Sequence, residues 1–171
     1  MRQEVVYLGV GSNIGDKVNN YLRALRRMAT SDHTRIHAVS PLYKTEPIGY
    51  QEQDWFINGV AKVSTALLPH PLHAFLQGIE RAMGREKTFP MGPRIIDLDI
   101  LFYGEAVLEE AGLIIPHPRL HERGFVLVPL ADLAPDLLHP VLKKTVSDLL
   151  KETGRSGVEL YAPPPQPGIF Q

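Results

Sequence analysis

Residues 92–104, GPRIIDLDILFYG, join an apolar run typical of a buried strand with two acidic residues. Successive side chains of a strand point to opposite faces, so Asp97 and Asp99 share one face. The other face is expected to pack into a core through four apolar side chains, Ile96, Leu98, Ile100 and Phe102. Two carboxylates roughly 6–7 Å apart along a strand repel each other, and one pKa rises unless a cation lies nearby. The stretch therefore predicts a core strand whose second face binds a metal ion.

Basic side chains lie on both sides of this acidic pair in the sequence. Arg85, Lys87 and Arg94 precede it, whereas His117 and Arg123 follow it. Taken one at a time, such side chains are usually solvated surface charges. Together with two acids they suit a polyphosphate, because arginine forks bind phosphate oxygens and Mg²⁺ takes one or two carboxylates plus phosphates. The sequence thus indicates a polyphosphate substrate bound with Mg²⁺.

The bulk composition narrows the class of protein. A length of 171 residues and a hydrophobic fraction of 44% suit one domain with a proper core. The net charge of −1 gives no general attraction for nucleic acid or an anionic membrane, so we expect neither as a partner. The lack of cysteine excludes a disulfide framework and a thiolate zinc site. No apolar run approaches the roughly 18 residues of a membrane span, and we expect a cytoplasmic protein, as a monomer or a weak dimer.

The order of the expected elements predicts the fold class. Strands are expected near residues 5–11, 35–45, 56–65 and 95–104, with helices at 16–30 and 69–84. This βαββαβ order is typical of a ferredoxin-like α+β sandwich, in which helices cover a mainly antiparallel sheet. A hairpin at 105–115 and a helix near 145–152 would complete a single domain over residues 1–154. The proline-rich residues 155–171 are expected to form an extended or disordered C-terminal tail.

The glycines of GVGSNIG, residues 9–15, do not match a dinucleotide-binding fingerprint. The third glycine, Gly15, comes one position late for G-x-G-x-x-G, and no acidic residue ends the following strand. A Walker P-loop is absent from the whole sequence. We therefore interpret Gly9, Gly11 and Gly15 as the tight turn into the first helix.

Two residues on one strand face could recognise a flat heterocycle. Phe56 and Asn58 lie two positions apart, so a ring and an amide would point the same way. A ring stacks on a heterocycle and an amide pairs with its edge. Phe125 offers a second ring. By itself this signal is weak, since aromatic residues are core residues more often than ligand contacts.

Several stretches resemble the 6-hydroxymethyl-7,8-dihydropterin pyrophosphokinase (HPPK) family of folate biosynthesis over about residues 5–150. The most specific are GPRIIDLDIL at residues 92–101 and PHPRLHER at residues 116–123. The resemblance implies a ferredoxin-like fold. It also implies transfer of the β,γ-diphosphate of ATP to the hydroxymethyl group of the pterin, with release of AMP, so that ATP and the pterin are the expected partners.

The resemblance also implies roles for individual residues. Asp97 and Asp99 would bind two Mg²⁺ ions. Catalytic contacts to the phosphates would come from Arg85, Arg94, His117 and Arg123. The ATP-binding residues would be Gln77, Glu80, Lys87, Ile100, His117 and Arg123. The pterin would contact Thr45, Glu46, Ile48, Phe56, Asn58 and Phe125. The loops at residues 46–54 and 85–93 would be lids.

The chain departs from the family pattern at two positions of the second loop. Lys87 stands where the family often has arginine, and Met91 stands where it often has tryptophan. Lysine keeps the charge but loses the bidentate fork, so ATP packing and loop closure could differ. Two other functions stay open at this point: a ferredoxin-like module that binds RNA or nucleotides without catalysis, and another metal-dependent transferase that uses an Asp-x-Asp pair.

Overall fold

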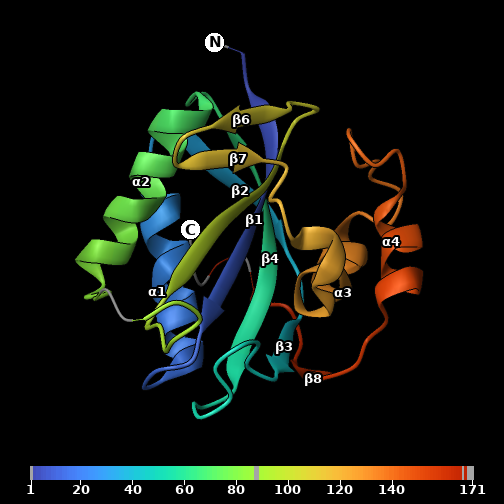
Figure 1. Cartoon of the computed structure of the whole chain (residues 1–171). Coiled ribbons are helices and arrows are strands. Elements are labelled where there is room, and N and C mark those ends of the chain that lie inside the picture. Colours follow the sequence, from blue (N-terminus) through green and yellow to red (C-terminus); the bar gives the residue numbers. More distant parts are fainter. Residues whose placement is uncertain (1, 87–88, 167, 169–171) are drawn as a thin grey trace.

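A computed structural model describes residues 2–86, 89–166 and 168 of the chain (Figure 1). The strands are β1 (Glu4–Ser12), β2 (Thr34–Val39), β3 (Leu42–Thr45), β4 (Phe56–Thr65), β5 (Asp97–Tyr103), β6 (Leu108–Glu110), β7 (Leu113–Ile115) and β8 (Val158–Ala162). The helices are α1 (Lys17–Ala29), α2 (Pro69–Ala82), α3 (Gly124–Leu133) and α4 (Val146–Thr153), with a short 3₁₀ helix at Leu120–Glu122. Among the described residues, no helix is both long and apolar enough to cross a membrane.

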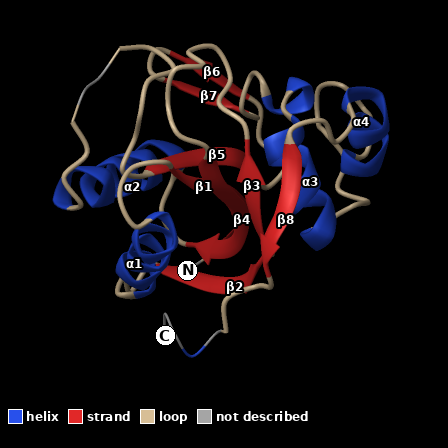
Figure 2. Cartoon of the chain, turned by 90° about the horizontal axis from the view of Figure 1, so that it is seen from below, coloured by secondary structure: helices blue, strands red, loops and turns tan. Residues whose placement is uncertain are grey.

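The main sheet has the strand order β5-β1-β4-β3-β8, and β2 also pairs with β4. Every pair in it is antiparallel. Helices α1 and α2 lie on one face of this sheet, and α3 and α4 lie on the other (Figure 2). Each face has its own hydrophobic core. This arrangement confirms the predicted ferredoxin-like α+β sandwich.

The two helices of the first layer each begin with a favourable first turn and bury one stripe of side chains. The side chain of Asp16 accepts a hydrogen bond from the backbone N–H of Asn19 and so caps α1. Helix α2 begins with prolines, whose missing N–H groups are not needed in a first turn. The buried stripe of α1 is Asn20, Tyr21, Ala24, Leu25 and Met28, and that of α2 is Leu72, Leu76, Ile79 and Glu80.

The single strand expected at residues 35–45 is divided into β2 and β3. Both pair with β4, one after the other along the same edge. Between them, the backbone N–H of Ser40 donates to the carbonyl of Val60, and the Ser40 hydroxyl accepts from the N–H of Val60. Pro41 follows and has no N–H for the ladder. The proline therefore interrupts the strand, which the apolar pattern alone did not reveal.

An irregularity in β5 changes which core its residues join. Leu8 of β1 pairs with Ile100, whereas the preceding Tyr7 pairs with Phe102, so the register shifts across Leu101. Such a bulge reverses the alternation of side chains beyond it. Ile100 therefore packs under α1 and α2, while Phe102 packs on the opposite face with Leu101. The expectation that Phe102 shares a face with Ile100 is wrong for this reason.

Helix α3, strand β8 and the 3₁₀ helix at Leu120–Glu122 were not predicted. Helix α3 buries consecutive residues from Val126 to Leu130 and contains Pro129, so it shows no amphipathic period. Strand β8 lies within residues 155–171, where we expected a tail, and it pairs with β3 at the edge of the main sheet. The expected helix near 145–152 and the hairpin at 105–115 are present as α4 and the pair β6–β7.

Candidate active site

The candidate site lies on the α3 side of the sheet, where β1 and β5 run next to each other. Gly11 pairs with Asp97 across these strands, and Gly9 pairs with Asp99. A Cβ atom at Gly11 would lie 2.4 Å from Oδ1 of Asn58, so glycine leaves the space that this amide occupies beside the acids. Both glycines are part of β1. The expectation that they form the turn before α1 is therefore wrong.

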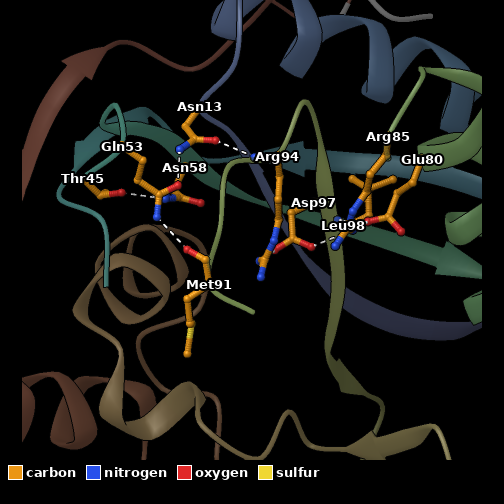
Figure 3. A network of polar contacts seen from close by, with 10 residues as sticks. All are labelled: Asn13, Thr45, Gln53, Asn58, Glu80, Arg85, Met91, Arg94, Asp97 and Leu98. Carbon is orange, nitrogen blue, oxygen red and sulfur yellow. Dashed lines mark hydrogen bonds and ion pairs between the residues drawn. The ribbon is translucent and has the colours of Figure 1, made fainter. Parts of the chain in front are cut away.

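Asp97 is held by two arginines from the segment that precedes β5. Its Oδ1 accepts a hydrogen bond from Nη1 of Arg85 at 3.0 Å, and its Oδ2 accepts from Nη1 of Arg94 at 2.9 Å (Figure 3). Both guanidinium groups also form ion pairs with this carboxylate. The structure thus joins two of the predicted phosphate-binding cations, Arg85 and Arg94, directly to a predicted metal ligand.

The charged form of Asp99 is disfavoured by its surroundings, and a nearby cation would favour it. Its burial raises its pKa to about 7, and the neighbouring charges of Asp97 and Glu80 act in the same direction. The Arg123 and Arg94 guanidinium groups oppose this rise but do not cancel it. One pKa of the pair is thus raised, as the sequence predicted for two carboxylates on one strand face, although burial is the largest cause.

Glu80 ties α2 to this part of β5. The side chain is buried, and it accepts hydrogen bonds from the backbone N–H of Leu98 at 2.9 Å and from Arg85. Burial raises the pKa of Glu80, while these two donors favour its charged form. Glu80 therefore fixes both the position of the strand and the direction of the Arg85 side chain.

A polar cavity of about 570 Å³ opens between α2 and β5. We call it the polar cavity. It is lined by His73, Gln77, Glu80, Arg81, Arg85, Glu86, Phe89, Pro90, Arg94, Asp97, Leu98 and Asp99. The mixture of guanidinium groups, an amide and two strand carboxylates suits a charged ligand with phosphate groups and a cation.

A second, smaller pocket of about 70 Å³ lies beside it, and we call it the aromatic pocket. Its lining residues are Gly11, Thr45, Glu46, Ile48, Phe56, Asn58, Met91, Arg94, Asp97, Arg123 and Phe125. All six residues predicted to contact a pterin are among them. Inside the pocket, Nδ2 of Asn58 donates a hydrogen bond to Oγ1 of Thr45 at 2.6 Å. Arg94 and Asp97 line both spaces, so the polar cavity and the aromatic pocket adjoin.

One guanidinium group, that of Arg123, and one imidazole, that of His117, lie near the acids. Arg123 directly precedes α3, and its guanidinium carbon lies 5.5 Å from the centre of the Phe125 ring. Burial lowers the pKa of Arg123, and the charge of Asp99 acts against that shift. Burial and the nearby Arg123 also lower the pKa of His117 to about 4, so this imidazole is neutral at pH 7. Its Nδ1 accepts from the N–H of Arg119, which leaves the proton on Nε2 as a donor.

A comparison with protein families agrees with this geometry. The model of the 7,8-dihydro-6-hydroxymethylpterin-pyrophosphokinase (HPPK) family matches residues 7–135. The chain belongs to the HPPK family. The match covers the acids of β5, both basic segments and every residue assigned to the aromatic pocket, but it ends before α4 and β8.

Relatives of this HPPK chain include separate enzymes and longer proteins. The 2-amino-4-hydroxy-6-hydroxymethyldihydropteridine pyrophosphokinase of Methylorubrum extorquens is 42% identical over 153 residues, which cover 90% of this chain and 96% of the relative. The folic acid synthesis protein fol1 of Schizosaccharomyces pombe is 44% identical over 94% of this chain, but the match spans only 22% of that protein. A crystal structure of wild-type HPPK-DHPS from Plasmodium falciparum with pteroate has a TM-score of 0.71 at 17% identity, over 88% of this chain and 42% of that one. This last likeness supports the fold.

The resemblance to the HPPK family did not point to Asn13, which lies at the centre of a polar network (Figure 3). Its Oδ1 accepts from the backbone N–H of Arg94 at 2.7 Å, and its own N–H donates to the carbonyl of Arg94. Its Nδ2 donates to Oε1 of Gln53 at 2.8 Å, and Nε2 of Gln53 donates to the carbonyl of Met91. Asn13 thus fixes Arg94 and links the two loops predicted to be lids. In the sequence it is one polar residue after a strand, a pattern too common to single it out.

The structure describes Met91 and Ile100, but it does not describe Lys87. Met91 has a φ of 63°, and its side chain lines the aromatic pocket and lies close to Gly49. Lys87 lies outside the described residues, so its assignment to ATP stays a prediction. Ile100, also assigned to ATP, buries its side chain in the core under α1 and α2.

Metal binding at this HPPK site would depend on few protein ligands. Among the described residues, no group of three or more histidine, aspartate or glutamate side chains is arranged to hold a metal ion. Asp97 and Asp99 on one strand face would supply two oxygens and leave the remaining positions to water or phosphate, as Mg²⁺ commonly requires. A bound cation would favour the charged form of Asp99, whose pKa is raised chiefly by burial.

Proposed function

We propose that this chain transfers the β,γ-diphosphate of ATP to the hydroxymethyl group of 6-hydroxymethyl-7,8-dihydropterin and releases AMP. The observation that carries the proposal is the pair of adjoining spaces, one polar and one aromatic, which share Arg94 and Asp97. A transfer between two substrates needs both reacting groups at such a common boundary. The name of the Methylorubrum extorquens relative supports the same reaction.

In this proposal ATP occupies the polar cavity. Arg85 and Arg94, which hold Asp97 in the structure, turn part of their donor capacity to phosphate oxygens when the nucleotide binds. His117 and Arg123 donate from the opposite side. Gln77 lines the cavity from α2. The backbone N–H of Leu98 points to Glu80, away from the neighbouring strand β1. In an antiparallel strand every second residue directs its N–H to the same side, so the N–H of Ile100 has the same direction. Ile100 would therefore contact the nucleotide through its backbone.

Two Mg²⁺ ions accompany ATP in this proposal, held by Asp97 and Asp99 together with phosphate oxygens. When bound, they would neutralise phosphate charge on both sides of the bond that breaks. The fit rests on the two carboxylates themselves, which lie on one strand face and both line the polar cavity. The presence of the metal and the number of ions are parts of the proposal.

The pterin occupies the aromatic pocket, with its ring between Phe56 and Phe125 and its polar edge against Asn58 and the segment from Thr45 to Ile48. The hydroxymethyl oxygen forms the new bond to the β-phosphorus, and the bridging oxygen leaves with AMP. The protein contributes positioning and fixed positive charge, which are the main sources of catalysis in phosphoryl transfer.

The deciding experiment measures AMP release from ATP in the presence and absence of the hydroxymethyl pterin, with Mg²⁺. We expect AMP only with the pterin, and no AMP from Asp97→Ala or Asp99→Ala. Asp32→Ala, an exposed acid away from both spaces, is the matched control and should keep full activity. Circular dichroism checks that each variant is folded. ADP as the product, or activity in either strand variant, would contradict the proposal. The cytoplasmic location and the monomeric state expected from the sequence stay predictions.

A further inference from the structure

We propose that residues 154–162 contribute to pterin binding, because they position the segment from Thr45 to Ile48 against Phe125. This inference rests on the proposed function. It concerns a part of the chain that lies beyond residues 7–135, the range matched by the family model. We call residues 154–162 the C-terminal wall.

The first support is a backbone ladder that continues into the pterin-reading segment. Strand β8 pairs with β3, and Val158 lies opposite Thr45. One residue beyond the end of β3, the N–H of Glu46 donates to the carbonyl of Gly157 at 3.1 Å. The side chain of Thr45 in turn accepts from Asn58. The C-terminal wall therefore fixes the backbone on which two predicted pterin contacts stand.

The second support is tight packing on both sides of the wall. Gly157 has a φ of 75°, and a Cβ atom there would lie 3.2 Å from Oε2 of Glu46. A Cβ atom at Gly124, the first residue of α3, would lie 2.9 Å from the carbonyl oxygen of Gly154. Gly124 directly precedes Phe125. The wall thus contacts the loop that carries Glu46 and the helix end that carries the Phe125 ring, and it sets the distance between them.

The third support is a cavity of about 270 Å³ next to the aromatic pocket. Ser156, Gly157 and Val158 form one side of it. Its other sides include Thr45, Glu46, Ile48 and Phe125, all of which also line the aromatic pocket. A shift of the C-terminal wall would therefore be transmitted to four residues of the aromatic pocket.

The far end of the wall is held as well. The Tyr161 ring lies 5.5 Å from the Trp55 ring, centre to centre. Trp55 directly precedes Phe56, the first residue of β4. Nothing in the C-terminal wall lines the polar cavity. Changes in the wall should therefore act on the pterin and leave ATP binding as it is.

The test compares two glycine substitutions in the full chain. Gly157→Ala adds a methyl group against Glu46. Gly112→Ala is the matched control, because Gly112 has a similar φ of 83° in the β6–β7 turn and a Cβ there meets nothing within 4 Å. Both substitutions place alanine at a positive φ, so they share the backbone strain. Only Gly157→Ala adds a contact with Glu46, and only it should shift the C-terminal wall. We expect Gly157→Ala to raise the KM for the pterin about tenfold (about 1.4 kcal/mol), with the KM for ATP and the kcat within about twofold of wild type.

A second variant at the same position distinguishes a shift of the C-terminal wall from misfolding of the protein. Gly157→Asn adds a larger side chain at the same place, but asparagine tolerates a positive φ better than alanine. It should therefore fold at least as well as Gly157→Ala and weaken pterin binding at least as much. The inference is overturned if both variants bind the pterin as wild type does, or if they lose ATP and pterin affinity equally. If wild type itself releases no AMP with the pterin, the proposed function falls, which is a separate outcome.

Discussion

His117 offers a prediction whose magnitude follows from its surroundings. Burial and the neighbouring Arg123 lower its pKa from 6.5 to about 4 in the folded protein. The unfolded chain therefore binds a proton at His117 in the window between these two values, while the folded protein does not. Stability contributed at this site is complete above pH 6.5 and is lost as the pH falls toward 4.

For a single group with these two pKa values, proton linkage lowers the free energy of unfolding by about 2 kcal/mol between pH 7.5 and pH 5. Part of the His117 ring reaches solvent, so we expect about 1–2 kcal/mol. His117→Gln removes the titrating group but keeps a side chain able to donate. The wild type should therefore lose about 1–2 kcal/mol more than the variant when the pH is lowered.

Urea unfolding at pH 7.5 and pH 5, without nucleotide or metal, measures this difference. The other titrating groups, including the buried His139, are present in both proteins and cancel in the comparison. His33→Gln, which removes an exposed imidazole, is the control. Equal losses in wild type and His117→Gln, or a larger loss in the variant, would refute the account of His117 as a partly buried, neutral donor.

Three further predictions concern the strands and the network around the site. Asp99→Asn should raise the free energy of unfolding of the metal-free protein at pH 8, because burial disfavours the charged carboxylate, and it should abolish AMP release; a less stable variant in urea would contradict this. Gly11→Ala should lower the free energy of unfolding by about 1–3 kcal/mol and weaken pterin binding, because its Cβ would meet Asn58; an unchanged pterin titration would count against it. Asn13→Asp keeps an acceptor but loses the donor to Gln53, so the KM for the pterin should rise severalfold, and an unchanged KM would show that this link between the loops is dispensable.

The fold was largely predictable because the strand and helix periods are clear in the first hundred residues. The acids of β5 stood out since they interrupt an apolar alternation, and the structure places them on one face as expected. The bulge at Leu101 was not predictable, because a register shift depends on how β1 pairs with β5 and leaves no mark on composition. Helix α3 was missed for the opposite reason, since burial on all sides removes the polar face that defines an amphipathic helix.

The site residues whose chemistry is restricted by their role could be predicted from the sequence. Those that act through their position relative to the backbone could not. Rings, amides and carboxylates of the two spaces were identified from the sequence and its family resemblance, and they do line those spaces. Asn13 and Gly157 act through hydrogen bonds and close approach to the backbone. Their importance depends on neighbours far away in the sequence, which no local pattern encodes.

The contacts on the outer edge of β5 have a consequence for how this protein behaves in a crowded solution. An exposed edge strand offers unpaired N–H and C=O groups to other chains. Here the N–H of Leu98 is bonded to Glu80, and the carbonyl of Leu101 accepts from the N–H of His117. One side chain and one backbone group thus occupy two positions along this edge. Glu80, which lines the polar cavity, therefore also hinders edge-to-edge pairing of β5 with another chain.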